Sequence, residues 1–332
     1  MRLTMPDPAI DWLLEKNNPS VRYFTLRYLL DYDEQDGAVR TARRAILQSE
    51  PVQKILAAQS PEGYWAKPGG GYSPKYLATD WQILFLAELG ADGRSRPVRK
   101  GCEYVLAHAA APRGGFSAYT DARPAGVLHC LNGNLVWALS ALGYAYDERV
   151  RLAVEWLAGA ITGDDFDRYY ASGTTGPNFQ CVANSKQPCA WGAIKALRAL
   201  VNLPEEFKTA RVRKAIAATV EFLLGRDLAT ADYPYTRRIS GEWFKFGFPL
   251  SYTSDILEGA LALCEAGLAR DPRLGHAVDL IASKRGPDGR WLLRHSLNGK
   301  MCTDVENKGE PSKWVTLRAL RVLRAAGREP FS

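Results

Sequence analysis

The sequence predicts an all-α fold in which about six helix pairs place an inner ring of helices inside an outer ring. Three observations carry this prediction. Segments rich in Ala and Leu recur about every 50 to 60 residues and end in Gly or a polar turn. Segments with one charged helical face lie between them. Strand signals are almost absent, since alternating β-branched runs joined by an Asn-Gly or Asp-Gly hairpin do not occur.

The Ala- and Leu-rich segments are expected to be the inner helices, because helices this apolar must be buried on most sides. In chain order they are Asp80–Gly90, Asn134–Gly143, Cys189–Leu200, Asp255–Gly267 and Trp314–Gly327, and Pro19–Leu30 is a candidate for a sixth. The expected outer helices are Pro97–His108, Glu148–Ala158, Ala210–Leu224 and Arg273–Ser283. Closing the pairs into a barrel buries the inner helices without the polar end repeats that an open helical solenoid, the alternative, requires.

Composition places the chain among globular proteins. It has 332 residues, 46% of them hydrophobic and 24% charged. Apolar runs such as Ile83–Ala87 fall far short of the roughly 20 residues that a membrane-spanning helix needs. The N-terminus lacks the order of a secretory signal, because Asp7 and two prolines interrupt it. We therefore expect a cytoplasmic protein with one domain over 1–332, in which 227–254 is an aromatic-rich loop or lid.

The formal net charge is +7, but the basic residues are not concentrated in one stretch. Two small groups have helical spacing: Arg40, Arg43 and Arg44, and Arg318, Arg321 and Arg324. We expect both to lie on solvated helix faces, and we expect no nucleic-acid partner. Six cysteines occur without any CxxC pair, which predicts free thiols.

One turn motif occurs more than once. It is Gln59-Ser-Pro-Glu-Gly63-Tyr-Trp65, with a degenerate copy at Arg285-Gly-Pro-Asp-Gly289-Arg-Trp291 and a weaker one at Gly114-Gly115-Phe116. The Gln-x-x-x-Gly-x-Trp form is similar to the turn motif of squalene cyclases. On these residues the chain resembles the terpenoid cyclase and protein prenyltransferase superfamily. The resemblance implies an α/α toroid of six helix pairs over most of the chain.

In such a barrel the residues just before the inner helices converge at one mouth. The candidate catalytic residues there are Asp80, His129, Cys130, Cys181, Cys189, Asp255 and Asp304. Asp80 or Asp255 would be the acid or base, His129 the proton shuttle, and a cysteine a nucleophile or ligand. The helix dipole is expected to lower the pKa of such a cysteine. Aromatic rings suit an isoprenoid chain or a carbocation, so the candidate substrate-binding residues are Tyr72, Tyr76, Trp243, Phe246 and Tyr252.

The motifs of known members of the superfamily are mostly missing. Terpene cyclases use Asp-x-Asp-Asp or Asp-Asp-x-x-Asp, whereas this chain has Asp164-Asp165-Phe-Asp167, which we expect to be a polar loop. Lanthipeptide cyclases hold zinc with Cys-His-Gly and Trp-Cys, and the corresponding strings here are His-Cys-Leu and Pro-Cys-Ala. The Asp-x-Cys of prenyltransferases occurs only in reverse, as Cys302-Thr-Asp304. The residue types also resemble those of linalool dehydratase-isomerase, which needs no metal.

We therefore expect an enzyme that cyclises, isomerises, hydrates or dehydrates an apolar, isoprenoid-like small molecule by acid–base chemistry without a cofactor. One alternative is zinc-dependent transfer to, or addition by, a thiol, with His129, Cys130 and Cys189 as ligands. The other is a non-catalytic toroid that binds a lipid or a protein. The substrate and the oligomeric state stay open.

Overall fold

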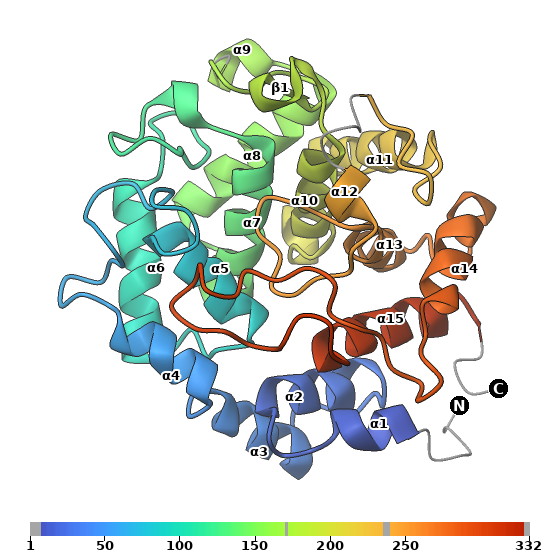
Figure 1. Cartoon of the computed structure of the whole chain (residues 1–332). Coiled ribbons are helices and arrows are strands. Elements are labelled where there is room, and N and C mark those ends of the chain that lie inside the picture. The colour runs from blue at the N-terminus through green and yellow to red at the C-terminus, as the bar shows by residue number, and fades with distance from the viewer. Residues whose placement is uncertain (1–7, 170–171, 235–239, 329–332) are drawn as a thin grey trace.

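The computed structural model describes residues 8–169, 172–234 and 240–328. Its regular secondary structure is mostly helical, with two short strands among the described residues, which confirms the all-α class (Figure 1). The expected inner segments form α2 (Pro19–Tyr28), α5 (Thr79–Glu88), α7 (His129–Leu139), α10 (Ala190–Val201), α13 (Ile256–Glu265) and α15 (Lys313–Ala325). The sequence therefore located each of these helices, with bounds that differ mainly at the start of α7.

The helices with a charged face lie outside these segments. They are α3 (Gly37–Ile46), α4 (Glu50–Ala57), α6 (Arg96–His108), α8 (Glu148–Thr162), α11 (Ala210–Leu224) and α14 (Gly275–Ser283). Figure 1 shows α6, α8, α11 and α14 on the outer side of α5, α7, α10 and α13. The shorter elements are α1 (Pro8–Leu13), α9 (Phe166–Tyr169), α12 (Ser240–Trp243) and the antiparallel strands β1 (Gln180–Cys181) and β2 (Gln187–Pro188).

The inner helices contact one another in order around the middle of the molecule. α5 packs on α7, α7 on α10, α10 on α13, α13 on α15, and α15 on α2. The first and last of these helices therefore touch, and the ring centroids of Phe24 and Trp314 are 5.9 Å apart. Gly90, which follows α5, packs against Phe24, because a Cβ on Gly90 would lie 3.0 Å from that ring.

The start of α7 is a correction to the sequence prediction. Helix α7 begins at His129, whereas we expected residues 129–133 to be a loop before Asn134. Gly133 lies inside this helix and serves close packing, because a Cβ there would lie 2.4 Å from the backbone carbonyl carbon of Lys195 on α10. Gly192 has the same role on α10, since its Cβ would lie 3.1 Å from that of His129.

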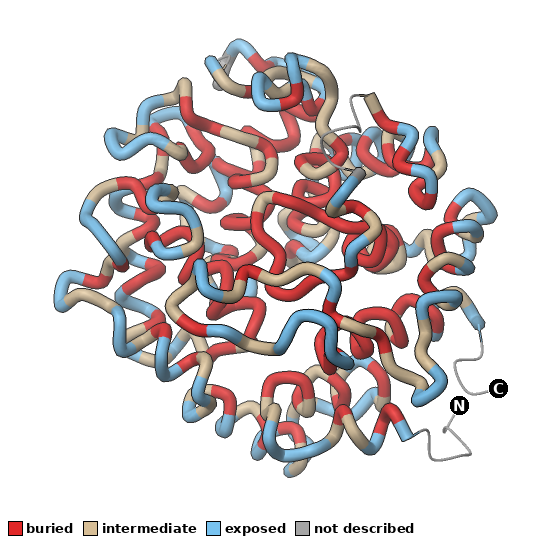
Figure 2. The backbone as a smooth tube through the Cα atoms, in the orientation of Figure 1, coloured by how far each residue is buried: buried red, intermediate tan, exposed pale blue. Residues whose placement is uncertain are grey.

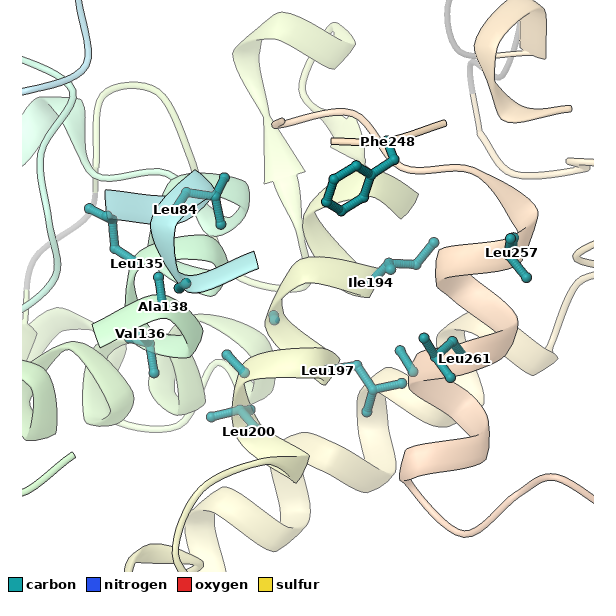
Figure 3. Close-up of a cluster of buried hydrophobic side chains, with 14 of the residues drawn as sticks. Leu84, Leu135, Val136, Ala138, Ile194, Leu197, Leu200, Phe248, Leu257 and Leu261 are labelled. Carbon is teal, nitrogen blue, oxygen red and sulfur yellow. The ribbon is translucent and has the colours of Figure 1, made fainter. Parts of the chain in front are cut away.

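The core fills the space between the inner helices. Every residue of α5 is buried, and Figure 2 shows buried residues through the middle of the molecule with exposed ones at its periphery. Figure 3 shows buried apolar side chains from four inner helices, among them Leu84, Leu135, Ile194 and Leu257, together with Phe248. The predicted burial of the Ala and Leu positions is confirmed for these helices.

Two loop segments run side by side over the end of the ring where the inner helices begin. The amide of Arg294 donates to the carbonyl of Phe246 (2.9 Å), and the amide of Phe248 donates to the carbonyl of His295 (3.3 Å). The ring of Phe248 stacks on Trp314 with centroids 3.9 Å apart. In Figure 1 these segments are the orange and red traces that cross in front of the inner helices.

The repeated turn motif forms the same structure in its two better copies. The indole Nε1 of Trp65 donates to the carbonyl of Ile55 (2.7 Å), and that of Trp291 donates to the carbonyl of Ile281 (2.7 Å). Both indoles are buried. Each tryptophan thus ties its own turn to the outer helix that precedes it.

Each copy is also tied to the next inner helix. The amide of Trp65 donates to the hydroxyl of Thr79 on α5 (3.1 Å), and the amide of Trp291 donates to that of Thr316 on α15 (3.0 Å). In the weaker copy the amide of Phe116 donates to the Oδ1 of Asn132 on α7 (2.5 Å). The motif therefore links an outer helix to the inner helix that follows it.

Removing the threonine hydroxyl should weaken this link. Thr316→Val keeps the side-chain shape but leaves the buried amide of Trp291 without an acceptor, so we expect the free energy of unfolding to fall by about 1 to 3 kcal/mol. Thr41→Val, at an exposed position of α3, should change it by less than about 0.5 kcal/mol. Urea unfolding of both variants measures the difference. Equal effects of the two substitutions would contradict this role of the motif.

Candidate functional site

Asp80 lies in the first turn of α5 with its carboxyl group enclosed by protein. The residue is 1% exposed. Among the described residues, neither carboxyl oxygen has a hydrogen-bond partner. Burial raises the pKa of Asp80 to about 7, because desolvation disfavours the charged form. Asp80 is thus an acid whose protonation changes near neutral pH.

Aromatic side chains from two loops gather beside Asp80, around Trp81. The ring centroids of Tyr72 and Tyr76 lie 5.1 and 5.5 Å from Trp81, and that of Tyr252 lies 6.3 Å from it. Trp81 Nε1 donates to the carbonyl of Tyr72 (2.7 Å). We call Asp80, Tyr72, Tyr76, Trp81 and Tyr252 the acid site.

The groups of the acid site also affect the pKa values of its tyrosines. Burial raises the pKa of Tyr72 above its usual range, and the nearby Cys130, Tyr252, Tyr76 and Asp80 raise it further. Burial also raises the pKa of Tyr76, and a hydrogen bond with Tyr252 adds to that effect. The phenols of Tyr72 and Tyr76 are therefore neutral at physiological pH. The predicted convergence of residues from before α5 and before α13 occurs at this point.

The segment that carries Tyr252 is held in place from both sides. Asn134 on α7 donates from Nδ2 to the carbonyl of Ser251 (2.8 Å). On the outer side, the ammonium of the exposed Lys75 lies 4.3 Å from the ring centroid of Tyr252 and 5.9 Å from that of Tyr72. The aromatic residues therefore lie between the inner helices and a surface lysine.

The candidate cysteines Cys130, Cys181 and Cys189 lie near one another, and the thiols of Cys130 and Cys189 are not activated. Burial raises the pKa of Cys130 to about 12, and the neighbouring Cys189 and Cys181 contribute in the same direction. Burial also raises the pKa of Cys189 to about 11, although backbone amides at the start of α10 act in the opposite direction. The expectation that the helix dipole lowers these pKa values is wrong, because desolvation is the larger effect.

His129 points toward the outer helix α8. Its ring centroid lies 5.5 Å from that of Trp156 and 5.3 Å from that of Phe179. Nδ1 is 3.2 Å from the hydroxyl of Thr175, and Nε2 has no partner among the described residues. Burial lowers the pKa of His129 to about 3, so the ring is neutral near pH 7. This apolar environment favours a packing role over the expected proton shuttle.

The other two candidate acids, Asp255 and Asp304, accept hydrogen bonds from backbone amides. Asp255 is the N-cap of α13, where Oδ1 accepts from the amide of Glu258 (2.8 Å) and Oδ2 from that of Gly247 (2.9 Å). Burial raises the pKa of Asp255 to about 7 against the effect of these hydrogen bonds. Asp304 is exposed, and its Oδ1 accepts from the amide of Gly299 (2.8 Å). Asp80 differs from these two acids, because its carboxyl group accepts no hydrogen bond from the described residues.

Trp243 and Phe246 pack in the core away from the acid site. Trp243 is fully buried, its Nε1 donates to the carbonyl of Leu228 (2.9 Å), and its ring lies 5.5 Å from that of Tyr233. Phe246 is 2% exposed and lies under the ammonium of Lys284, the residue that follows α14. Part of the expected lid, 235–239, lies outside the described residues.

The sequence analysis missed a group of buried charges on the inner helices. Lys195 Nζ lies 2.7 Å from both carboxylate oxygens of Glu258. Arg198 pairs with Glu88, and Arg318 Nη2 lies 2.7 Å from the other oxygen of Glu88. We call these five residues the charge network. Their signal in the sequence was the isolated charges within otherwise apolar helical segments.

The network corrects one expectation and explains one pKa. Arg318 is 7% exposed, so it does not lie on a solvated helix face as expected. Burial alone would raise the pKa of Glu88, but the charges of Arg198 and Arg318 lower it to about 2. Glu88 is therefore ionised whenever the protein is folded near neutral pH.

The structure gives the zinc alternative no ligand set within the part of the chain it describes. There, no three His, Cys, Asp or Glu side chains are grouped closely enough to hold a metal ion. Within the same ranges, no helix combines the length and apolar character needed to cross a membrane.

Comparison with known proteins finds distant structural similarity only. No family model and no curated protein matches the sequence. A crystal structure of a protein from Actinoplanes aligns over 96% of this chain and 98% of that one, at 17% identity and a TM-score of 0.45. Type II terpene cyclase MstE from Scytonema aligns over 94% and 89%, at 13% identity and a TM-score of 0.45. A variant of MstE in complex with merosterolic acid A (product) aligns over 97% and 99%, at 15% identity and 0.43. With values this low, these similarities carry no argument about this chain.

The raised pKa of Asp80 makes the stability depend on pH. Between about pH 4 and pH 7 the folded chain retains a proton that the unfolded chain has lost, so the free energy of unfolding falls as pH rises. Asp80→Asn removes this contribution. The free energy of unfolding of the variant, measured relative to that of the unsubstituted protein, should therefore increase by on the order of 3 kcal/mol from pH 4 to pH 8.

Denaturant unfolding across this pH range measures the effect. The raised pKa of Asp255 also lowers the free energy of unfolding as pH rises, in the variant and in the unsubstituted protein alike. The difference between the two proteins therefore reports Asp80. Asp304→Asn, at an exposed carboxyl group, is the matched control and should keep the original pH profile. Parallel profiles for Asp80→Asn and the unsubstituted protein would show that Asp80 has an ordinary pKa.

Proposed function

We propose that this chain is an α/α toroid enzyme that protonates an apolar, isoprenoid-like small molecule, with Asp80 as the proton donor. The observation that carries the proposal is a fully buried carboxyl group without a hydrogen-bond partner among the described residues. A general acid works best when its pKa lies near the operating pH. Asp80, with its pKa raised to about 7 by burial, meets that condition.

The rings of the acid site suit the product of such a protonation. When Asp80 gives its proton to an alkene carbon, the π electrons form the new C–H bond and the adjacent carbon becomes a cation. Protonating a tertiary alcohol and releasing water gives the same kind of cation. The faces of Tyr72, Trp81 and Tyr252 attract such a cation through their quadrupoles. A later proton loss back to the Asp80 carboxylate completes an isomerisation, a cyclisation or a dehydration.

The helix arrangement supports the toroid part of the proposal. The inner helices contact one another in order, and the last of them, α15, packs on α2. The turn motif joins an outer helix to the next inner helix through equivalent hydrogen bonds at Trp65 and Trp291. A closed ring of helix pairs accounts for both observations.

Activity assays with a matched pair of variants test the proposal. The purified chain is incubated with a panel of isoprenoid alkenes and of tertiary and allylic alcohols, and products are identified by gas chromatography with mass spectrometry. We expect conversion of at least one compound, and a loss of at least about 100-fold in Asp80→Asn. Asp304→Asn should convert the compound at the original rate, because this exposed side chain caps a turn.

Two results would count against the proposal. Full activity of Asp80→Asn would place the acid elsewhere. Saturable binding of an isoprenoid without conversion, unchanged in Asp80→Asn, would favour a non-catalytic lipid-binding protein.

A further inference from the structure

A second candidate site lies among the inner helices, apart from the acid site. It is a cavity of about 90 Å³ to which α2, α5, α7, α10, α13 and α15 all contribute side chains. None of the acid-site residues lines it. Tyr28, at the end of α2, is 46% exposed and lies at its edge. Since a buried water needs roughly 10 to 15 Å³ of such space, the cavity has room for a small molecule.

The carboxylates in the cavity wall already have donors. Glu88 accepts from Arg198 through one oxygen and from Arg318 through the other. Glu258 accepts from Lys195 through both oxygens, and Arg198 Nη1 lies 3.5 Å from one of them. The acceptor capacity of these two groups is therefore largely used within the protein.

The third carboxylate in the wall is occupied in the same way. Glu265 accepts from Arg321 Nη2 through Oε1 (2.8 Å) and from Asn202 Nδ2 through Oε2 (2.9 Å). Each carboxylate oxygen in the wall thus has at least one donor, and the wall offers a ligand few free acceptors.

The guanidinium groups, in contrast, keep unused donors. Each has five N–H bonds in a planar fork. Among the described residues, Arg198 donates through Nη1 alone, and Arg318 and Arg321 through Nη2 alone. The remaining N–H bonds of three guanidinium groups would have to find water or a ligand in the cavity. The ligand that fits is an acceptor, and its best form is an anion with two oxygens in one plane.

The charges of the wall favour a single negative charge on the ligand. Three guanidinium groups face three carboxylates, so the charges of the lining side chains are close to balanced. Lys195 is bound to Glu258 behind the wall, where burial lowers its pKa and the charge of Glu258 acts in the opposite direction. A ligand with one negative charge therefore disturbs this balance less than a dianion.

Four aromatic rings also line the cavity, those of Phe24, Tyr28, Trp137 and Trp314. The Arg198 guanidinium carbon lies 3.5 Å from the ring centroid of Trp137, and that of Arg321 lies 4.1 Å from the centroid of Tyr28. Phe24 stacks beside Tyr28 with centroids 5.8 Å apart and also contacts Trp314. These surfaces favour a ligand whose charged group is attached to a short apolar part.

We propose that this cavity binds a small organic carboxylate, a monoanion whose oxygens receive the free N–H bonds of Arg198, Arg318 and Arg321 and whose short apolar part packs on the aromatic wall. The site is independent of the acid site and of the proton transfer proposed there. Inorganic phosphate shares the acceptor chemistry but lacks the apolar part.

Binding of isobutyrate to the full chain tests the proposal, with isobutyramide and inorganic phosphate as comparison ligands. Titration calorimetry gives the affinity, and the fluorescence of Trp137 and Trp314 in the wall reports occupancy of the cavity. We expect saturable binding of isobutyrate that weakens with added salt, and at least about ten-fold weaker binding of the neutral amide. Absence of isobutyrate binding, equal binding of the amide, or tighter binding of phosphate would overturn the proposal.

Two arginines on the same helix provide the matched variants. Arg321→Gln should weaken isobutyrate binding by at least about ten-fold. Arg324→Gln, one turn further along α15, removes an arginine that pairs with Asp31 and does not line the cavity, and it should bind as the unsubstituted protein does. Equal effects of the two variants would mean that isobutyrate responds to the general surface charge.

A third variant tests the cavity without altering charge. Ala262→Leu fills the space beside α13 and should abolish binding while the melting temperature shows a folded protein. Binding that persists in this folded variant would place the ligand elsewhere. Asp80→Asn should bind isobutyrate normally, so failure of the proposed catalytic function and failure of this binding site would be seen separately.

Discussion

A carboxyl group that is buried among apolar helices must either face a cation or keep its proton. Helix α5 shows both outcomes at its two ends. Burial would raise the pKa of Glu88, but the charges of Arg198 and Arg318 hold it at about 2. Asp80 has no hydrogen-bond partner among the described residues, and burial raises its pKa to about 7. One short helix thus carries a permanent anion at one end and a titratable acid at the other.

The ion pairs of Glu88, at the C-terminal end of α5, constrain how the inner helices are arranged. Glu88, Arg198, Glu258 and Arg318 come from four different inner helices, and their charges compensate one another only when these helices are correctly placed. Removing one partner of a buried ion pair leaves an uncompensated charge and costs about 3 to 5 kcal/mol. The charge network therefore favours one relative placement of these four helices. The acid end lies outside this network, so Asp80 can gain or lose a proton without breaking an ion pair.

The inner helices and part of the candidate site could be predicted from the sequence. Apolar periodicity locates the inner helices because burial on most sides excludes charges from them, and Asp80 stood out at the start of one. Periodicity could not show that Gly133 serves close helix packing, because that role depends on α10. It also could not pair Glu88 with Arg318, which is 230 residues away along the chain. The roles of His129 and Asp255 likewise depend on contacts that no local pattern encodes.

The titration of Asp80 itself is the most direct test of this account. Carbon-13 NMR of the side-chain carboxyl groups, with Asp80→Asn used to assign the resonance, follows each acid across the range in which the protein stays folded. The account predicts that Asp80 titrates near pH 7 while Glu88 stays ionised to the lowest pH at which the fold persists. An Asp80 resonance that titrates near its ordinary value of about 3.9 would contradict it, because a carboxylate that is charged at neutral pH has no proton to donate.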